Sequence, residues 1–129
     1  MDAITTIAEA ARRELEEGVK RLPLPEQGPW IVYVFVNPLA PGAYAKLDGR
    51  FAEEPDLHHS ITIDVDTDTP LAFRMEGTAY TEREGKPDRV RTSLGAHGLR
   101  DLAQAEAAAV SLARAGWDHI LANRKRPGA

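Results

Sequence analysis

The chain has 129 residues, 43% of them hydrophobic and 28% charged, and its formal net charge is −4. This length and composition predict a single globular domain, residues 1–129, that is large enough to bury a hydrophobic core. The absence of cysteine excludes disulfide bonds, thiol catalysis and the common cysteine-ligated zinc sites. The acidic balance argues against broad, non-specific binding to nucleic acid, because such binding depends on neutralising phosphates.

No apolar run approaches the roughly 20 residues that a membrane-spanning helix needs. The first residues, MDAITTIAEAARRELEE, have neither the basic start nor the apolar core of a signal peptide. We therefore expect a cytoplasmic protein with no membrane partner. The many alanines, arginines, prolines and aspartates suggest a bacterial origin.

Apolar residues at three- and four-residue spacings predict a first helix that begins after the capping residue Asp2 and runs to about Arg21. Its apolar stripe consists of Ile4, Ile7, Ala8, Ala11, Leu15, Val19 and Leu22. Pro23 disfavours helical geometry in the residue before it, so we interpret residues 22–25 as a rigid linker.

Residues 30–36, WIVYVFV, are nearly all β-branched or aromatic. This composition predicts a strand that is covered on both faces and therefore lies at the centre of a sheet. A proline-rich loop and a weaker strand over residues 44–51 follow. Residues 51–59 have no clear period, and we expect a loop there.

Residues 60–94 predict a three-stranded antiparallel meander, because apolar and polar residues alternate with a period of two. Ile61 and Ile63 fall on the buried face, and Asp64 and Asp66 fall on the solvent face. The composition of residues 66–70 predicts the first turn of this meander.

The second turn of the meander is assigned from charge pairing. A loop over residues 84–87 places Arg83 opposite Asp88 and Glu82 opposite Arg89. Opposite-charge pairs across strands stabilise by roughly 0.2 to 1 kcal/mol each, whereas the register shifted by one residue brings two arginines together.

A long final helix is predicted over residues 99–124. Its apolar side carries Leu102, Ala109, Ala113, Trp117 and Ile120. A helix of this length exceeds a typical strand of roughly 17 to 20 Å, so we expect part of it to extend past the sheet. Its many alanines allow a close approach by either the amino-terminal helix or a second subunit.

The order of these elements predicts an α+β fold. The expected architecture is an N-terminal helix, a four- to five-stranded antiparallel meander and a long C-terminal helix, in two layers with the helices on one face of the sheet. The chain is similar in size and acidity to small acidic type III secretion chaperones, but their plan places an additional helix between strands. Folds of the nuclear transport factor 2 kind also begin with a helix, but they usually end in strands. No residue motif supports either family, so none is assigned.

Asp64, Asp66 and Asp68 form a D-x-D-x-D series, which opens calcium-binding loops of the EF-hand type. The resemblance ends there, because Thr69 stands where that loop needs glycine and Met75 where it needs a bidentate glutamate. The three aspartates are candidate ligands for weak binding of a divalent cation. Turn chemistry and protection of a sheet edge by charge are the alternative explanation.

The four histidines are further candidates for metal or acid–base chemistry, because a neutral imidazole is a good ligand. His58 and His59 lie beside Asp56, with His97 and His119 elsewhere in the chain. Adjacent histidines in a strand point to opposite faces, so at most one of the pair can serve a given site.

Glu106, His97 and Tyr80 are the candidate catalytic residues. Glu106 falls at the margin of the apolar stripe of the last helix, where a desolvated carboxylate is a general-base candidate. Alternatively, it pairs with an arginine such as Arg74 or Arg91. His97 lies between glycines in the loop before that helix, where its ring either approaches a cleft or is solvated.

A local basic patch is the remaining candidate site. The candidate contacts to nucleic acid are Arg89, Arg91, Arg124, Lys125 and Arg126. The last three also complement the negative end of the final helix, which explains them without a ligand.

These patterns support three functional hypotheses. The leading one is a non-enzymatic protein-interaction module, an adaptor or chaperone-like protein that acts as a homodimer and needs no cofactor. The second is a small-molecule-binding protein or hydrolase-like enzyme with a pocket between the sheet and the helices. The third is an accessory protein associated with nucleic acid.

Overall fold

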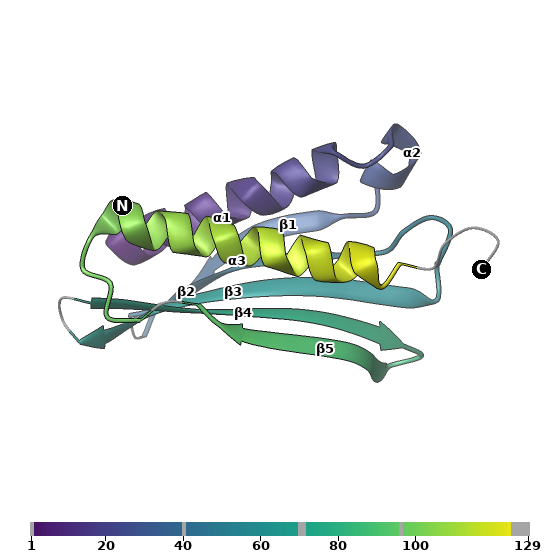
Figure 1. Cartoon of the computed structure of the whole chain (residues 1–129). Coiled ribbons are helices and arrows are strands. Elements are labelled where there is room, and N and C mark those ends of the chain that lie inside the picture. Colours follow the sequence, from purple (N-terminus) through teal and green to yellow (C-terminus); the bar gives the residue numbers. More distant parts are fainter. Residues whose placement is uncertain (1, 40, 70–71, 96, 125–129) are drawn as a thin grey trace.

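A computed structural model describes residues 2–39, 41–69, 72–95 and 97–124. Along the chain, one long helix precedes five consecutive strands and a second long helix follows them (Figure 1). The elements in chain order are α1 (Ala3–Lys20), α2 (Leu24–Gln27), β1 (Ile31–Val36), β2 (Ala43–Gly49), β3 (Leu57–Thr69), β4 (Ala72–Arg83), β5 (Lys86–Leu94) and α3 (Leu102–Ala122).

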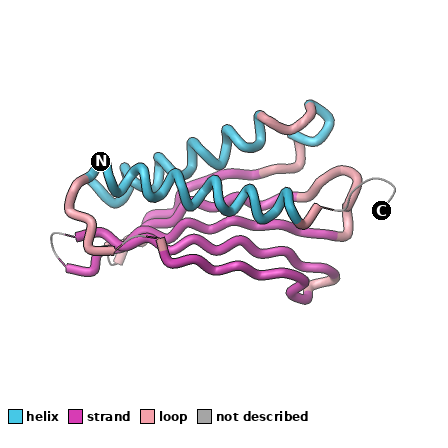
Figure 2. The backbone as a smooth tube through the Cα atoms, viewed as in Figure 1, coloured by secondary structure: helices cyan, strands magenta, loops and turns pink. Residues whose placement is uncertain are grey.

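The strands form one antiparallel sheet in the order β1-β2-β3-β4-β5, and each strand pairs with its neighbour in sequence. Helices α1 and α3 lie side by side on one face of this sheet (Figures 1 and 2). The predicted α+β class, meander and terminal helices are therefore confirmed.

Alternation along the strands builds the core between the two layers. In β2, for example, Ala43, Ala45 and Leu47 are buried, and the residues between them are only partly covered. The largest fully buried apolar side chains come from both layers and from the loop after β2: Ile7, Leu15, Leu47, Phe51, Ile61, Ile63, Val65, Met75 and Ile120. The stripe predicted for the first helix faces this core, with Ile4 and Val19 at its margin.

Helices α1 and α3 approach closely because their contact is made by small residues. Ala105, Ala109 and Ala113 of α3 are completely buried. The indole Nε1–H of Trp117 donates to the carbonyl oxygen of Leu15 at 3.0 Å. The amino-terminal helix thus occupies the position for which either that helix or a second subunit was expected.

The prediction that residues 30–36 form a central strand is wrong. Strand β1 lies at one edge of the sheet, and its outward side chains Ile31, Tyr33 and Phe35 are exposed. An apolar sequence on both faces indicates burial only when both faces have something to pack against, and here the helices cover just one.

The predicted register of the second hairpin is also wrong. Glu84 and Gly85 form a two-residue turn with φ of 52° and 77°, so Arg83 faces Lys86 and Glu82 faces Pro87. A bulge beside Thr81 and Glu82 then shifts the register of the remaining pairs by one residue. The turn matches the right-handed twist of the strands, and this advantage outweighs the weak charge pairs used for the prediction.

The boundaries of β3 and α3 differ from the predictions. Strand β3 begins at Leu57, inside the predicted loop 51–59, and continues to Thr69, through most of the predicted turn 66–70. Helix α3 begins only at Leu102, because the Asp101 side chain caps it by accepting from the N–H groups of Ala103 and Gln104.

The final helix does not exceed the sheet in length. Its 21 residues make about 32 Å, whereas the 13 residues of β3 extend to about 43 Å. The expected extension past the sheet is therefore wrong, because the strands are longer than typical. Leu102, predicted for the buried stripe, is 39% exposed at the first turn of the helix.

We predict that Gly18→Ala destabilises the protein by about 2 kcal/mol or more, although alanine favours helices by up to about 1 kcal/mol over glycine. A Cβ at Gly18 would overlap the indole ring of Trp117 and displace it from the Leu15 carbonyl. The measurement is chemical denaturation followed by circular dichroism. Gly28→Ala is the matched control, because a Cβ there meets nothing within 4 Å. Equal stability of the two variants would contradict this account of the contact between α1 and α3.

Candidate functional site

The outer face of the sheet, which the helices leave uncovered, carries the side chains that offer recognisable binding chemistry. The strand registers place Phe35, Tyr44, Asp64 and Glu76 in one row across β1, β2, β3 and β4. The row passes from aromatic to acidic within four strands. The candidate site is built from this row and from the neighbouring edge of β1.

Exposed apolar side chains follow one another along β1 and into the loop after it. We call this set the apolar strip: Ile31, Tyr33, Phe35 and Leu39. Ile31 is 63% exposed and Leu39 is 93% exposed. A run of large apolar side chains in water is typical of an interaction surface, whereas single exposed apolar residues are common on any protein.

The aromatic rings beside the apolar strip form a preorganised platform. Phe35 and Tyr44 stack with their ring centroids 5.2 Å apart and an interplanar angle of 23°. Tyr33 meets Tyr44 edge to face at 6.4 Å. Because each ring rests on the next across the strand pair, their faces are held for contact with a ligand.

The backbone of β1 also has an open side. The N–H of Asn37 donates to the carbonyl of Gly42 at 3.0 Å, which makes this a hydrogen-bonded pair. Such pairs alternate along an antiparallel ladder, so Ile31, Tyr33 and Phe35 bond to β2. The backbone groups of Val32, Val34 and Val36 consequently point away from the sheet, available to another strand.

The opposite edge of the sheet is protected. The sequence of β5, KPDRVRTSL, contains four charged residues and a proline, whereas that of β1, IVYVFV, contains none of either. Charge, proline and a bulge are the features that prevent edge-to-edge association. The sheet therefore has one edge built against pairing and one edge that permits it.

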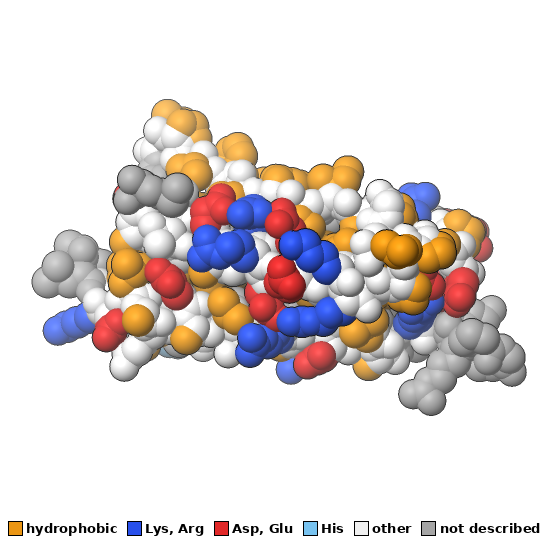
Figure 3. All heavy atoms as spheres, turned by 90° about the horizontal axis from the view of Figure 1, so that it is seen from above, with side chains coloured by type: hydrophobic (Ala, Val, Ile, Leu, Met, Phe, Trp, Pro, Cys, Tyr) orange, Lys and Arg blue, Asp and Glu red, His pale blue; other side chains and the backbone are white. Residues whose placement is uncertain are grey.

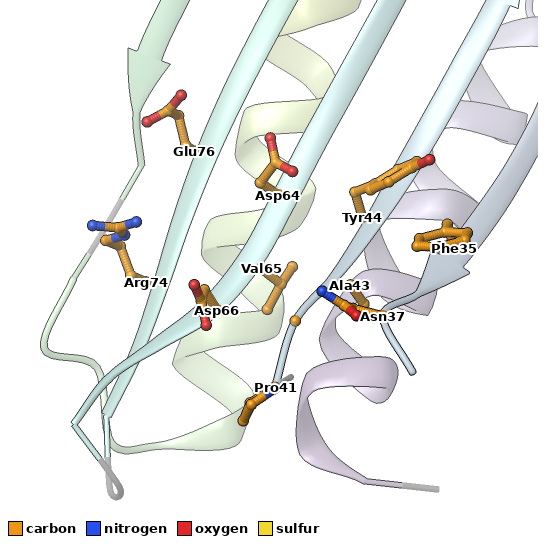
Figure 4. A pocket seen from close by; sticks show the side chains of 11 residues that line it. Phe35, Asn37, Pro41, Ala43, Tyr44, Asp64, Val65, Asp66, Arg74 and Glu76 are labelled. Atoms are coloured by element: carbon orange, nitrogen blue, oxygen red, sulfur yellow. The ribbon is translucent and has the colours of Figure 1, made fainter. Parts of the chain in front are cut away.

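A hollow of about 390 Å³ lies at the end of the sheet where β1 meets the loop to β2. Figure 4 shows Phe35 and Tyr44 on one side of it and Asp64 and Glu76 on the other. Asp66 and Arg74, which face each other across β3 and β4, lie nearer the loop. The hollow combines an aromatic wall with three carboxylates and one guanidinium.

Asp64 lies beside the other two carboxylates of the hollow. Loss of hydration raises its pKa, and the neighbouring charges of Glu76 and Asp66 raise it further. Asp64 and Glu76 are directly opposite in the register, and like charges in that position destabilise a strand pair. The hollow is therefore a place where an added positive charge would be favourable.

A second polar group lies further along the same outer face. His58 Nε2 is 3.3 Å from Asp48 and its Nδ1 is 3.4 Å from Glu82, so the imidazole lies between carboxylates of two neighbouring strands. Loss of hydration and the Glu82 carboxylate raise the pKa of Tyr80, which is in the same region. The His58 imidazole of β3 therefore lies close to side chains of both neighbouring strands, β2 and β4.

The structure does not bring the candidate catalytic residues together. Tyr80 lies on the outer face of the sheet, whereas Glu106 lies in a groove between α1 and α3, on the other side of the sheet. His97 is exposed in the loop before α3. Glu106 also lies far from its suggested partners: Arg74 is on the outer face, and Arg91 is beside Leu112 on the opposite side of α3.

The top of the helical layer carries interspersed acidic and basic side chains (Figure 3). Arg12 pairs with Glu9 and Glu16, and Arg114 pairs with the buried Glu14 at 2.9 Å. Because these acidic and basic side chains pair with one another, they do not form a patch of a single charge.

The candidate metal ligands lie on strand β3 and not in a loop. Asp64 and Asp66 point to the outer face, and the side chain of Asp68 falls outside the described residues. Within the described parts of the chain, no three acidic or histidine side chains form a group suited to a metal ion. His58 and His59 point to opposite faces, as expected for neighbours in a strand.

The candidate nucleic-acid contacts are dispersed. Arg91 is exposed on β5, and Arg124 is held by Glu26 and Glu53 with its guanidinium 4.4 Å from the ring centre of Phe51. The side chain of Arg89 and the whole of Lys125 and Arg126 lie outside the described residues. Arg124 therefore covers the buried ring of Phe51 at one end of the core while pairing with two carboxylates.

A buried polar cluster lies at the opposite end of the sheet from the hollow. His59 is completely buried, its Nδ1 is 2.9 Å from the hydroxyl of Thr81, and its ring packs against Trp30 and Phe51. The His59 Nε2 and the Trp30 Nε1 have no hydrogen-bond partner among the described residues. Burial lowers the pKa of His59 to about 4, and the nearby histidines His58 and His119 contribute.

Phe35 and Tyr44 were not recognised as site residues from the sequence. The alternation of Tyr33 and Phe35 with valines was the available signal, but it was interpreted as a strand buried on both faces. Recognising the site requires knowing that helices cover only one face of the sheet.

Comparison with protein-family models, with curated proteins and with solved structures finds no match for this chain. Among the described residues, no helix combines the length and apolar character needed to cross a membrane.

We predict that His59 makes the protein less stable as the pH falls from about 6.5 to about 4. The folded state holds His59 neutral, with its pKa lowered from 6.5 to about 4. The unfolded state therefore binds more protons in this window, so stability is complete above pH 6.5 and is lost towards pH 4. The contribution of this group is roughly 2 to 3 kcal/mol.

The measurement is the free energy of unfolding of the wild type and of His59→Gln between pH 4 and 7.5. The variant should lose less stability on acidification, because glutamine does not titrate. His58→Gln is the control, since His58 is partly exposed and lies between carboxylates. The explanation is wrong if the wild type and His59→Gln have parallel pH profiles.

Proposed function

We propose that this protein is a non-enzymatic protein-interaction module that acts as a homodimer, with strand β1 as the element through which two copies pair. The observation that carries the proposal is the difference between the two edges of the sheet. The β1 edge is apolar and has unused backbone groups, whereas the β5 edge carries charges and a proline.

The charge distribution permits a second copy to occupy the edge. Each chain carries a net charge of −4, which opposes self-association in general. Strand β1 itself has no charged residue, so antiparallel pairing of two copies brings no like charges into direct contact. The same pairing aligns apolar side chains across the symmetry axis, where cross-strand apolar and aromatic pairs are favourable.

Edge pairing of this kind ends at two copies. An antiparallel pair of β1 strands follows a two-fold axis and uses the same surface on both molecules. The joined sheet then exposes a β5 strand at each end, and both of these edges are protected. The proposal therefore accounts for a closed dimer and not for an open fibre.

Pairing through β1 also supports the proposal of an adaptor or chaperone-like role. It places the two outer faces side by side, so that the aromatic rings of both copies flank one continuous surface. Extended polypeptides bind such surfaces through main-chain and side-chain contacts. A surface shared by two chains is wider than either single sheet offers.

The test is sedimentation equilibrium of the wild type and of Tyr33→Lys. The wild type should sediment with twice the chain mass of 14.1 kDa at micromolar concentrations. A lysine at the centre of β1 places positive charge at the paired edge, so the dissociation constant of the dimer should rise by about tenfold or more.

Val90→Lys is the matched control, because Val90 is 52% exposed on the outer face of the β5 edge. This variant should remain dimeric, and the thermal midpoints of both variants show that the fold is retained. A wild type that is monomeric at millimolar concentration would overturn the proposed dimer. The same conclusion would follow if Tyr33→Lys and the wild type had equal dissociation constants.

A further inference from the structure

We propose that the hollow beside Phe35, Tyr44, Asp64 and Glu76 binds the positively charged side chain of an arginine or lysine in an extended segment of a partner protein. This inference rests on the proposed function, because it gives the chemistry of the partner that the interaction module would bind. It does not depend on the dimer.

The hollow has aromatic rings on one side and carboxylates on the other. The row across four strands brings the stacked rings of Phe35 and Tyr44 next to the carboxylates of Asp64 and Glu76 (Figure 4). Tyr44 and Asp64 are direct partners in the register of β2 and β3. A side chain entering the hollow therefore meets an aromatic surface and a carboxylate together.

The charge of the lining favours a cation. Asp64, Asp66 and Glu76 contribute three carboxylates, and Arg74 contributes one positive group, which faces Asp66. The opposed pair of Asp64 and Glu76 is the part of the lining that an added positive charge would relieve. The pKa of Asp64 is raised by lost hydration and, in addition, by the same repulsion.

The aromatic wall distinguishes an organic cation from a metal ion. A guanidinium or ammonium group gains stabilisation over the face of an aromatic ring in addition to its contact with carboxylates. A metal ion needs several oxygen ligands converging on one point, and the described residues form no such group. Arginine combines both forms of recognition, since its planar fork binds carboxylates and stacks on rings.

The position of the hollow favours a side chain carried by an extended segment. The hollow of about 390 Å³ is open to solvent on the outer face, and Asn37, Pro41 and Gly42 of the loop after β1 form its end. It adjoins the apolar strip, so a segment lying along that strip can insert one charged side chain there. Apolar neighbours of that side chain would contact the strip itself.

The test uses a tripeptide, acetyl-Ala-Arg-Ala-amide, titrated into the isotope-labelled protein and followed by amide chemical shifts. We expect saturable shifts centred on Tyr44, Asp64 and Glu76. The citrulline analogue of the peptide has nearly the same shape without the charge, and it should bind at least tenfold more weakly. The double variant Asp64→Asn/Glu76→Gln should weaken binding of the arginine peptide by about tenfold or more.

Glu82→Gln is the matched control, because it removes a carboxylate from the same face of β4 outside the hollow. This variant should bind the arginine peptide as the wild type does. The inference fails if the arginine peptide produces no shifts, or if the citrulline peptide binds equally well. Undiminished binding by the double variant would also overturn it.

The titration separates this inference from the proposed dimer. Repeating it with Ile31→Lys tests the hollow in a chain whose β1 edge is disrupted, since Ile31 is exposed on β1 and neither lines the hollow nor supports its aromatic rings. Dimerisation without peptide binding would support the proposed dimer and refute the cation site. Peptide binding by a monomeric wild type would support the cation site and refute the proposed dimer.

Discussion

Strand β1 has apolar side chains on both faces, and the molecule covers only one of them. Val32 and Val34 pack towards the core, while Ile31, Tyr33 and Phe35 stay in water. Strands β2 to β4 do not share this conflict, because polar residues occupy most of their outward positions. The exposed face of β1 and the unused backbone groups at its edge are the basis of the functional account.

The two ends of the sheet differ in chemistry. At the end with Trp30, Phe51 and His59, the long helices and the loop after β2 enclose polar groups completely, and Arg124 closes the core with two acidic partners. At the other end, carboxylates and aromatic rings surround an open hollow. The enclosed end contributes stability that depends on pH, and the open end offers contacts to a partner.

The long helices and the alternating strands were predictable because periodicity records which side chains face a core. Periodicity does not record how many faces of a strand are covered, and β1 was therefore assigned to the centre of the sheet. The hairpin register depended on the backbone of Glu84, a residue other than glycine with positive φ, which charge pairing does not reveal. The hollow was not predicted, since residues from four strands form it only after the correct register is known.

The central claim is that the open edge of β1 pairs with a second strand. The most direct measurement is amide hydrogen exchange at Val32, Val34 and Val36 as a function of protein concentration. The account predicts that protection of these three amides rises with concentration, while the outward amides of β5 exchange at a constant rate. Rapid exchange of the three valine amides at every concentration would contradict it.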